Sequence, residues 1–211
     1  QEKQAKEMAF LSKALLIAVL LIFLILVGQF NSATTPIIIS ISVFLSLIGV
    51  LFGLLIFRMD FVILMTMIGI ISLAGIVVNN AIVLIDYINL IIYRKRKALN
   101  LDGAEQLTSS QLLECIVEAG KTRLRPVLLT AMTTILGLLP LALGININFK
   151  TLITELNPNF YIGGENVAFW GPMGWAIIYG LSFATFLTLV VVPILYYLIN
   201  KIKTKSVNVA A

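Results

Sequence analysis

Gly75-Ile-Val-Val-Asn-Asn-Ala-Ile-Val-Leu-Ile-Asp86 places two adjacent amides, and then a carboxylate, inside an otherwise apolar stretch that runs from Phe61 to Ile92. This stretch is long enough to cross a bilayer, for which about 20 apolar residues are required. In hydrocarbon, each polar side chain must find a partner or a water-filled path. Polar residues inside a membrane span are therefore candidates for a functional site.

The composition identifies the class of protein. Hydrophobic residues make up 60% of the chain and charged residues 12%, and the mean hydropathy is +1.04. These values are typical of an integral membrane protein and not of a soluble domain. The chain begins at Gln1, and its first residues form a charged run without the anatomy of a signal peptide. We therefore expect a piece of a longer polypeptide.

The apolar segments predict an all-α fold, a polytopic membrane bundle with five spanning helices. The expected spans cover residues 14–30, 36–57, 61–93, 126–144 and 172–199.

Crossing the membrane with these spans puts residues 31–35, 94–125 and 200–211 on one face, and residues 1–13, 58–60 and 145–171 on the other. The first face carries ten of the fifteen lysines and arginines, which predicts that it is cytoplasmic. The basic cluster is either this topology signal alone or a pocket for anionic lipid. Nothing in the sequence suggests that the protein binds nucleic acid.

Two connections have features of their own. Residues 102–120 predict a short amphipathic cytoplasmic helix in which Thr108 and Gln111 have the spacing of a capping box. This helix either lies along the membrane or packs against the rest of the protein. The loop 145–171, on the opposite face, contains turn signals at 157–159 and at 163–164. Its aromatic residues fit an interfacial belt better than a ligand cage.

The third span has a polar stripe. Ser72, Gly75, Asn79, Asp86 and Asn89 are separated by intervals that place them on one side of a helix. Such a side is expected to turn towards other helices, because lipid offers it no hydrogen bonds. Asn79 and Asn80 either join neighbouring helices or take part in function. We expect Asp86 to be an interfacial or salt-bridged residue, since it approaches the cytoplasmic boundary.

The fourth span offers a surface that could face these amides. Thr130, Thr133, Thr134 and Gly137 form a strip of hydroxyl groups and glycine. The alternative is that each threonine bonds to its own backbone, as threonines in membrane helices commonly do. The last span repeats this chemistry with Ser182, Thr185 and Thr188, so we expect a packed bundle.

Several chemistries lack the residues that they require. The chain has no histidine and a single cysteine, Cys115, which excludes an internal disulfide and makes a soft-metal site or a cofactor unexpected. An intramembrane hydrolase would use paired aspartates, a serine with a base, or a histidine motif. Asp86 is the only acidic residue within any expected span. We therefore expect no catalytic or metal-binding residues.

Several motifs, in order, resemble the resistance-nodulation-division (RND) superfamily, and most closely its hydrophobe/amphiphile efflux branch. The first is Gly75-Ile-Val-Val-Asn-Asn-Ala-Ile-Val-Leu-Ile-Asp-Tyr-Ile88. The others are Glu118-Ala-Gly-Lys-Thr-Arg-Leu-Arg-Pro-Val-Leu-Leu-Thr130, Thr134-Ile-Leu-Gly-Leu-Leu-Pro-Leu-Ala-Leu-Gly144, Gln29-Phe-Asn-Ser32, Ser46-Leu-Ile-Gly49 and Leu187-Thr-Leu-Val-Val-Val-Pro193. The resemblance covers almost the whole chain except the loop 145–171.

The resemblance implies the last five of twelve transmembrane helices of an inner-membrane pump, a secondary transporter and not an enzyme, with its C-terminus in the cytoplasm. It implies efflux of hydrophobic or amphiphilic compounds, driven by protons that move in the opposite direction. It also implies a homotrimer that docks to a periplasmic adaptor and an outer-membrane channel. Substrates, and the paired aspartates that accept protons, would bind outside this segment. Two other functions stay open: heavy-metal export, and a non-transporting accessory or assembly role.

The resemblance also assigns candidate residues for ion coupling. Family members often carry a lysine at the position of Asn79, a threonine at that of Thr130 and an arginine at that of Arg123. Asn80 joins this set, and the secondary candidates are Asp86, Ser72 and Thr134. An amide donates hydrogen bonds but carries no countercharge, so loss of the lysine is expected to raise the proton affinity of the aspartates. We hypothesise that Asn79 and Asn80 orient those carboxylates by hydrogen bonding.

Overall fold

The fold is a bundle of long helices with one small strand pair. The computed structural model describes residues 2–30, 34–100, 107–147, 153–154, 156 and 160–210. Within these residues, five helices are long and apolar enough to cross a membrane. They are α1 (Glu2–Phe30), α2 (Thr34–Ile56), α3 (Ile63–Ala98), α4 (Ser109–Leu143) and α6 (Glu165–Ala210). The predicted class, a helical membrane bundle with five spans, is confirmed.

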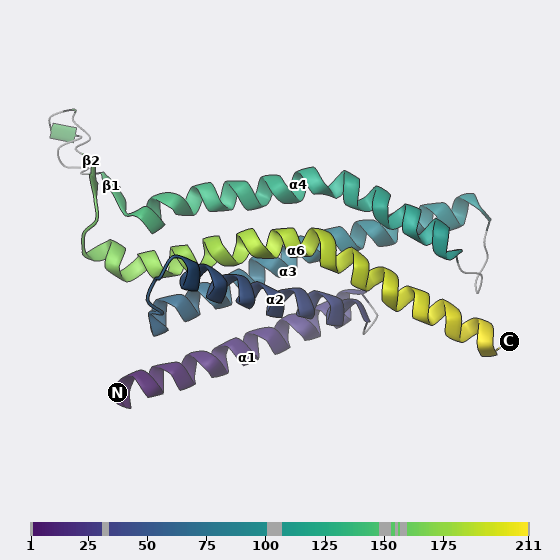
Figure 1. Cartoon of the computed structure of the whole chain (residues 1–211), viewed down its shortest axis with the longest axis horizontal. Coiled ribbons are helices and arrows are strands. Elements are labelled where there is room, and N and C mark those ends of the chain that lie inside the picture. Colours follow the sequence, from purple (N-terminus) through teal and green to yellow (C-terminus); the bar gives the residue numbers. More distant parts are fainter. Residues whose placement is uncertain are drawn as a thin grey trace.

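The helices run side by side, with α6 in the middle (Figure 1). Helix α6 packs against α2, α3 and α4, whereas α1 lies at the edge and contacts α2 and α3. The N-terminus, the turn between α2 and α3, and the strand pair gather at one end of the bundle, here called the N-end. The last turn of α3, the start of α4 and the end of α6 gather at the other, here called the C-end.

The core consists of two apolar clusters. The N-end cluster includes Leu11, Val50, Leu73, Ala131 and Ala176, one from each helix. The C-end cluster draws on the same five helices and includes Leu26, Ile39, Ile88, Cys115 and Val192. Each helix therefore contributes an apolar stripe to both halves of the bundle, as expected where packing and not the hydrophobic effect holds helices together in lipid.

Glycines allow the helices to approach closely. A side chain at Gly53 would overlap the ring of Tyr179, and one at Gly180 would overlap Leu73 and Val50. These contacts join α2, α3 and α6 at one level, so the absence of a Cβ is a packing requirement there.

Residues 109–120 form the first turns of α4 and not a separate helix. The capping box is present, because the Gln111 side chain accepts a hydrogen bond from the Thr108 backbone N–H at 3.1 Å and the reciprocal bond is also made. From Ser109, the helix continues without interruption past Pro126 to Leu143. Residues 102–106 of the expected 102–120 helix lie outside the described residues.

The segment 145–171 also differs from a simple loop. Strands β1 (Ile145–Ile147) and β2 (Phe160–Ile162) pair antiparallel, and residues 165–171 already belong to α6. The turn signal at 157–159 lies outside the described residues. At the other end of the chain, residues 2–13 continue directly into the first span as part of α1.

Candidate functional site

The two adjacent amides point to different surroundings. Asn80 is buried, with 8% of its surface exposed, whereas Asn79 is exposed. Consecutive residues of a helix are about 100° apart around its axis, so one amide enters the bundle while its neighbour looks out of it. Neither side chain forms a hydrogen bond with another described residue.

Asn80 belongs to a buried polar layer. Ser46 on α2 and Thr185 and Thr188 on α6 are also buried, and along their helices they lie between residues of the two apolar clusters. The Ser46 hydroxyl donates to the Val43 carbonyl at 2.6 Å, and the Thr185 hydroxyl donates to the Leu181 carbonyl at 2.7 Å. Their donors are therefore satisfied locally. The predicted packing role of Thr185 and Thr188 agrees with this burial.

The polar stripe of α3 is mostly open. Ser72, Gly75, Asn79 and Asp86 are all exposed, and a side chain built on Gly75 would meet no atom within 4 Å. Asn89 is the exception, because its Oδ1 accepts a hydrogen bond of 2.6 Å from the Tyr196 hydroxyl on α6. Among the described residues, the stripe therefore meets another helix through a hydrogen bond only at Asn89.

Asp86 makes no ion pair with any described residue. The recorded ion pair between α3 and α4 is instead that of Lys95 Nζ with Glu114 Oε2, at 3.6 Å. The salt-bridged alternative for Asp86 is thus not realised among the described residues, and its interfacial position stays a prediction.

The threonines of α4 bond to their own helix. The Thr130 hydroxyl donates to the Val127 carbonyl at 2.9 Å, and the Thr134 hydroxyl donates to the Thr130 carbonyl at 2.8 Å. Thr133 also bonds to carbonyls of the preceding turn. A side chain on Gly137 would meet nothing within 4 Å. The strip therefore does not face the asparagines through hydrogen bonds, although both α3 and α4 leave a small, polar surface open.

Arg123 is held against α3 by an aromatic ring. Its guanidinium carbon lies 4.3 Å from the centroid of the Tyr87 ring, and its Nε is buried without a hydrogen-bond partner. A cation over a ring face is attracted to the ring's quadrupole. Arg123, one of the predicted site residues, therefore lies beside Tyr87. Tyr87 directly follows Asp86, a second predicted site residue.

Sequence reasoning missed Tyr87 and Tyr196. Tyr196 is 107 residues from Asn89, its hydrogen-bond partner, and helical periodicity alone cannot pair residues on different helices. A signal for Tyr87 did exist, because it directly follows Asp86 near the basic end of the span.

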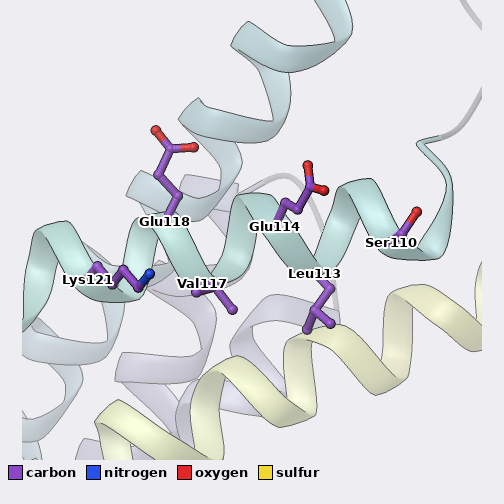
Figure 2. A pocket seen from close by; sticks show the side chains of 6 residues that line it. All are labelled: Ser110, Leu113, Glu114, Val117, Glu118 and Lys121. Carbon is purple, nitrogen blue, oxygen red and sulfur yellow. The ribbon is translucent and has the colours of Figure 1, made fainter.

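An open groove of about 530 Å³ lies on the C-end half of α4 and is lined by Ser110, Leu113, Glu114, Val117, Glu118 and Lys121. Figure 2 shows the two apolar side chains on one side of the helix and the two glutamates on the other. None of the predicted site residues lines this groove. Close by, burial raises the pKa of the Cys115 thiol, an effect that neighbouring Lys95 partly offsets. Among the described residues, no group of three or more His, Cys, Asp or Glu residues could hold a metal ion.

Comparison with known proteins identifies the family of the chain. Residues 1–148 match the model of the AcrB/AcrD/AcrF family. The chain is 37% identical over 196 residues to the swarming motility protein SwrC of Bacillus subtilis (strain 168). This alignment covers 93% of the chain and 16% of SwrC. The chain is 28% identical over 191 residues to the multidrug resistance protein MdtC of Erwinia tasmaniensis, with 90% and 16% covered.

A solved structure shares the architecture. The crystal structure of a heavy metal efflux pump (crystal form II) superimposes with a TM-score of 0.69 at 29% identity, over 95% of this chain and 16% of the pump. The chain thus spans about one sixth of the length of these relatives. RND transporters are multi-pass proteins of the inner membrane, and five long apolar helices agree with that setting. The chain belongs to the AcrB/AcrD/AcrF family of RND efflux transporters.

Proposed function

We propose that this chain supplies part of the ion-coupling helix bundle of a pump that exports hydrophobic or amphiphilic compounds in exchange for protons. The proposal rests on one observation: the two adjacent amides of α3 point to different surroundings. Asn80 enters the buried polar layer, and Asn79 lies on the exposed stripe with Ser72 and Asp86. An exposed polar stripe on a membrane helix calls for a polar partner, and the relatives are about six times longer than this chain.

In this proposal, carboxylates from the rest of the pump meet the open stripe of α3. Asn79 donates hydrogen bonds to the ionised carboxylates, and protonation weakens those bonds because a neutral acid is a poorer acceptor. A bound ion shifts the equilibrium between two conformations of the pump only as far as its affinities for those conformations differ. The buried amide of Asn80 would transmit the shift into the bundle, while Arg123 and Thr130 would line the approach from the C-end.

The test is transport by the full-length pump with Asn79→Leu. We expect slower efflux and a pH profile displaced from that of the parent pump, because leucine cannot hydrogen bond to a carboxylate. Val83→Leu is the control, since Val83 is another exposed residue of α3 and the change adds apolar bulk without removing a polar group. Unchanged efflux and unchanged pH dependence for Asn79→Leu would remove this residue from the mechanism.

The proposal includes an orientation and partners. The C-end, with its lysines and arginines, faces the cytoplasm, as the positive-inside rule predicts. The full-length pump assembles as a trimer with a periplasmic adaptor and an outer-membrane channel. A reporter fused after Ala211 that is active only in the cytoplasm tests the orientation, and an inactive fusion would reverse it.

Heavy-metal export is the second candidate, and one observation favours it: two of the similar solved structures are of a heavy metal efflux pump. The two functions differ in what the full-length pump protects against. A gene that restores growth in the presence of dyes and detergents, but not of metal salts, supports the first candidate. The reverse pattern supports the second, and restoration of neither supports an accessory role.

A further inference from the structure

The strand pair at the N-end is an amphipathic ribbon. Its register pairs Ile145 with Ile162 and Ile147 with Phe160. Residues that face each other across an antiparallel pair lie on the same side, and successive residues alternate sides. One face of the ribbon therefore consists of these four large apolar side chains, and the other carries Asn146 and Tyr161.

The apolar face is uncovered. Its exposed fractions range from 38% for Ile147 to 80% for Ile162. No charged residue occurs in either strand. A contiguous apolar surface of this kind marks an interaction site.

The opposite face is tied to the ends of the helices. The Asn146 side-chain amide donates to the Gly144 carbonyl at 3.0 Å and to the Gly163 carbonyl at 2.8 Å. The Gly163 backbone N–H also donates to the Gly144 carbonyl at 3.0 Å. Gly144 has a φ of 71°, a left-handed conformation that ends α4 and turns the chain into the ribbon. These bonds hold the Asn146 side chain at the base of the ribbon, where the chain leaves α4 and approaches α6.

Next to the ribbon, α4 also presents an exposed apolar side. Leu129, Met132, Leu136 and Leu143 are exposed and share one side of that helix, which ends just before Ile145. Figure 1 shows the ribbon beyond this end of α4, on the side of the bundle away from α1. Phe169 and Trp170, at the start of α6, are also exposed, and their rings pack edge to face with the centroids 5.0 Å apart. Aromatic residues gather in this way at the membrane–water boundary.

The backbone of the ribbon limits how deeply it can enter the membrane. A two-stranded sheet has an outer edge on each strand, and unpaired backbone groups are not tolerated in hydrocarbon. At the level of the headgroups, water satisfies these edges while the side chains reach the acyl chains. We propose that the four-residue apolar face of the β1–β2 ribbon is a shallow membrane anchor, which binds the lipid leaflet at the N-end beside α4.

The anchor is tested by placing spin labels on the two faces of the ribbon. The protein is the full-length pump without its native cysteines, reconstituted in vesicles of phosphatidylethanolamine and phosphatidylglycerol. Labels are attached at Phe160→Cys and Ile162→Cys on the apolar face, and at Tyr161→Cys on the opposite face as the matched control. Leu136→Cys, on the exposed apolar side of α4 within the fourth expected span, is the reference. The relaxation of each label is measured first with oxygen, which concentrates in lipid, and then with a water-soluble nickel chelate, and the two values are compared.

We expect the labels at 160 and 162 to be relaxed more by oxygen than by the chelate, as at 136, and the label at 161 to show the reverse order. Greater relaxation by the chelate at 160 and 162 would mean that the face lies in water, and would overturn the proposal. Protection from both reagents would mean that another part of the pump covers the face, and would overturn it equally. Ile145→Cys, on the same face, replaces either variant if that variant fails to assemble. The proposal is independent of the coupling ion and of the exported compound.

Discussion

The guanidinium of Arg123 on α4 lies over the ring of Tyr87 on α3, 4.3 Å from its centroid, while its Nε is buried without a hydrogen-bond partner. A buried donor without a partner is destabilising unless something else holds the cation. The ring supplies that attraction, which amounts to about 0.5–2 kcal/mol depending on exposure. Tyr87 is therefore a positioning residue for Arg123, which we place on the ion path.

Tyr87→Leu should impair transport more than Tyr87→Phe, because phenylalanine keeps the ring and leucine does not. In the full-length pump, we expect Tyr87→Phe to retain most of the efflux rate. Tyr87→Leu should lower the rate and displace its pH profile, a change that a purely structural defect would not produce. Tyr93→Leu is the control, since Tyr93 is exposed on the same helix. Equal behaviour of the two Tyr87 variants across the pH range would exclude the proposed role of the ring.

Tyr196→Phe should weaken the junction between α3 and α6. The change removes the hydrogen bond of 2.6 Å to Asn89 Oδ1, and such bonds between membrane helices are worth about 0.6–2 kcal/mol. We expect a lower thermal midpoint for the full-length pump in detergent. Tyr197→Phe serves for comparison, because the Tyr197 hydroxyl bonds to no described residue. A midpoint for Tyr196→Phe that matches the comparison variant would show that the bond adds nothing to stability.

Much of this fold could be predicted because its elements are long and apolar. A span of about 20 apolar residues has few alternatives in a membrane, and the capping box at Thr108 and Gln111 marked the start of α4. The join between residues 109–120 and the fourth span was missed because hydropathy falls at Lys121, Arg123 and Arg125, whereas helical hydrogen bonding is unaffected by charge.

The site was less predictable than the fold. Periodicity placed Asn79 on the polar stripe, and the structure shows that stripe exposed except at Asn89. It could not reveal which helix covers Asn80, or that Tyr87 and Tyr196 reach across to other helices, because those contacts depend on how the helices are rotated. The ribbon escaped prediction for another reason. Its strands have three residues each, too few to display an alternating pattern.

Gly180→Ala should destabilise the bundle where α2, α3 and α6 meet. The added methyl group would overlap Leu73 and Val50, and overpacking of this kind typically costs about 1–3 kcal/mol. Gly120→Ala is the matched control, because a side chain there meets nothing within 4 Å and alanine favours the helix. Thermal unfolding of the two full-length variants should give opposite shifts relative to the parent. A Gly180→Ala pump as stable as the parent would mean that the side chains of Leu73 and Val50 move aside at no cost.

Cys115 provides a pH-dependent readout of packing at the C-end. Its thiol is 1% exposed, and burial raises its pKa because the thiolate is poorly solvated there. The thiolate is the reactive form, so alkylation by a maleimide should be slower than for a free cysteine throughout the range from about pH 7 to about pH 9.

Lys95 lowers the pKa of the Cys115 thiol, and Glu118 raises it. Lys95→Met should therefore move the pH dependence of alkylation upwards, and Glu118→Gln should move it downwards. The rates would be measured by mass spectrometry on the folded full-length pump, with denatured protein as the reference for an accessible thiol. Shifts of the same sign in both variants would show that altered exposure, and not the charge of these neighbours, governs the reactivity of the thiol.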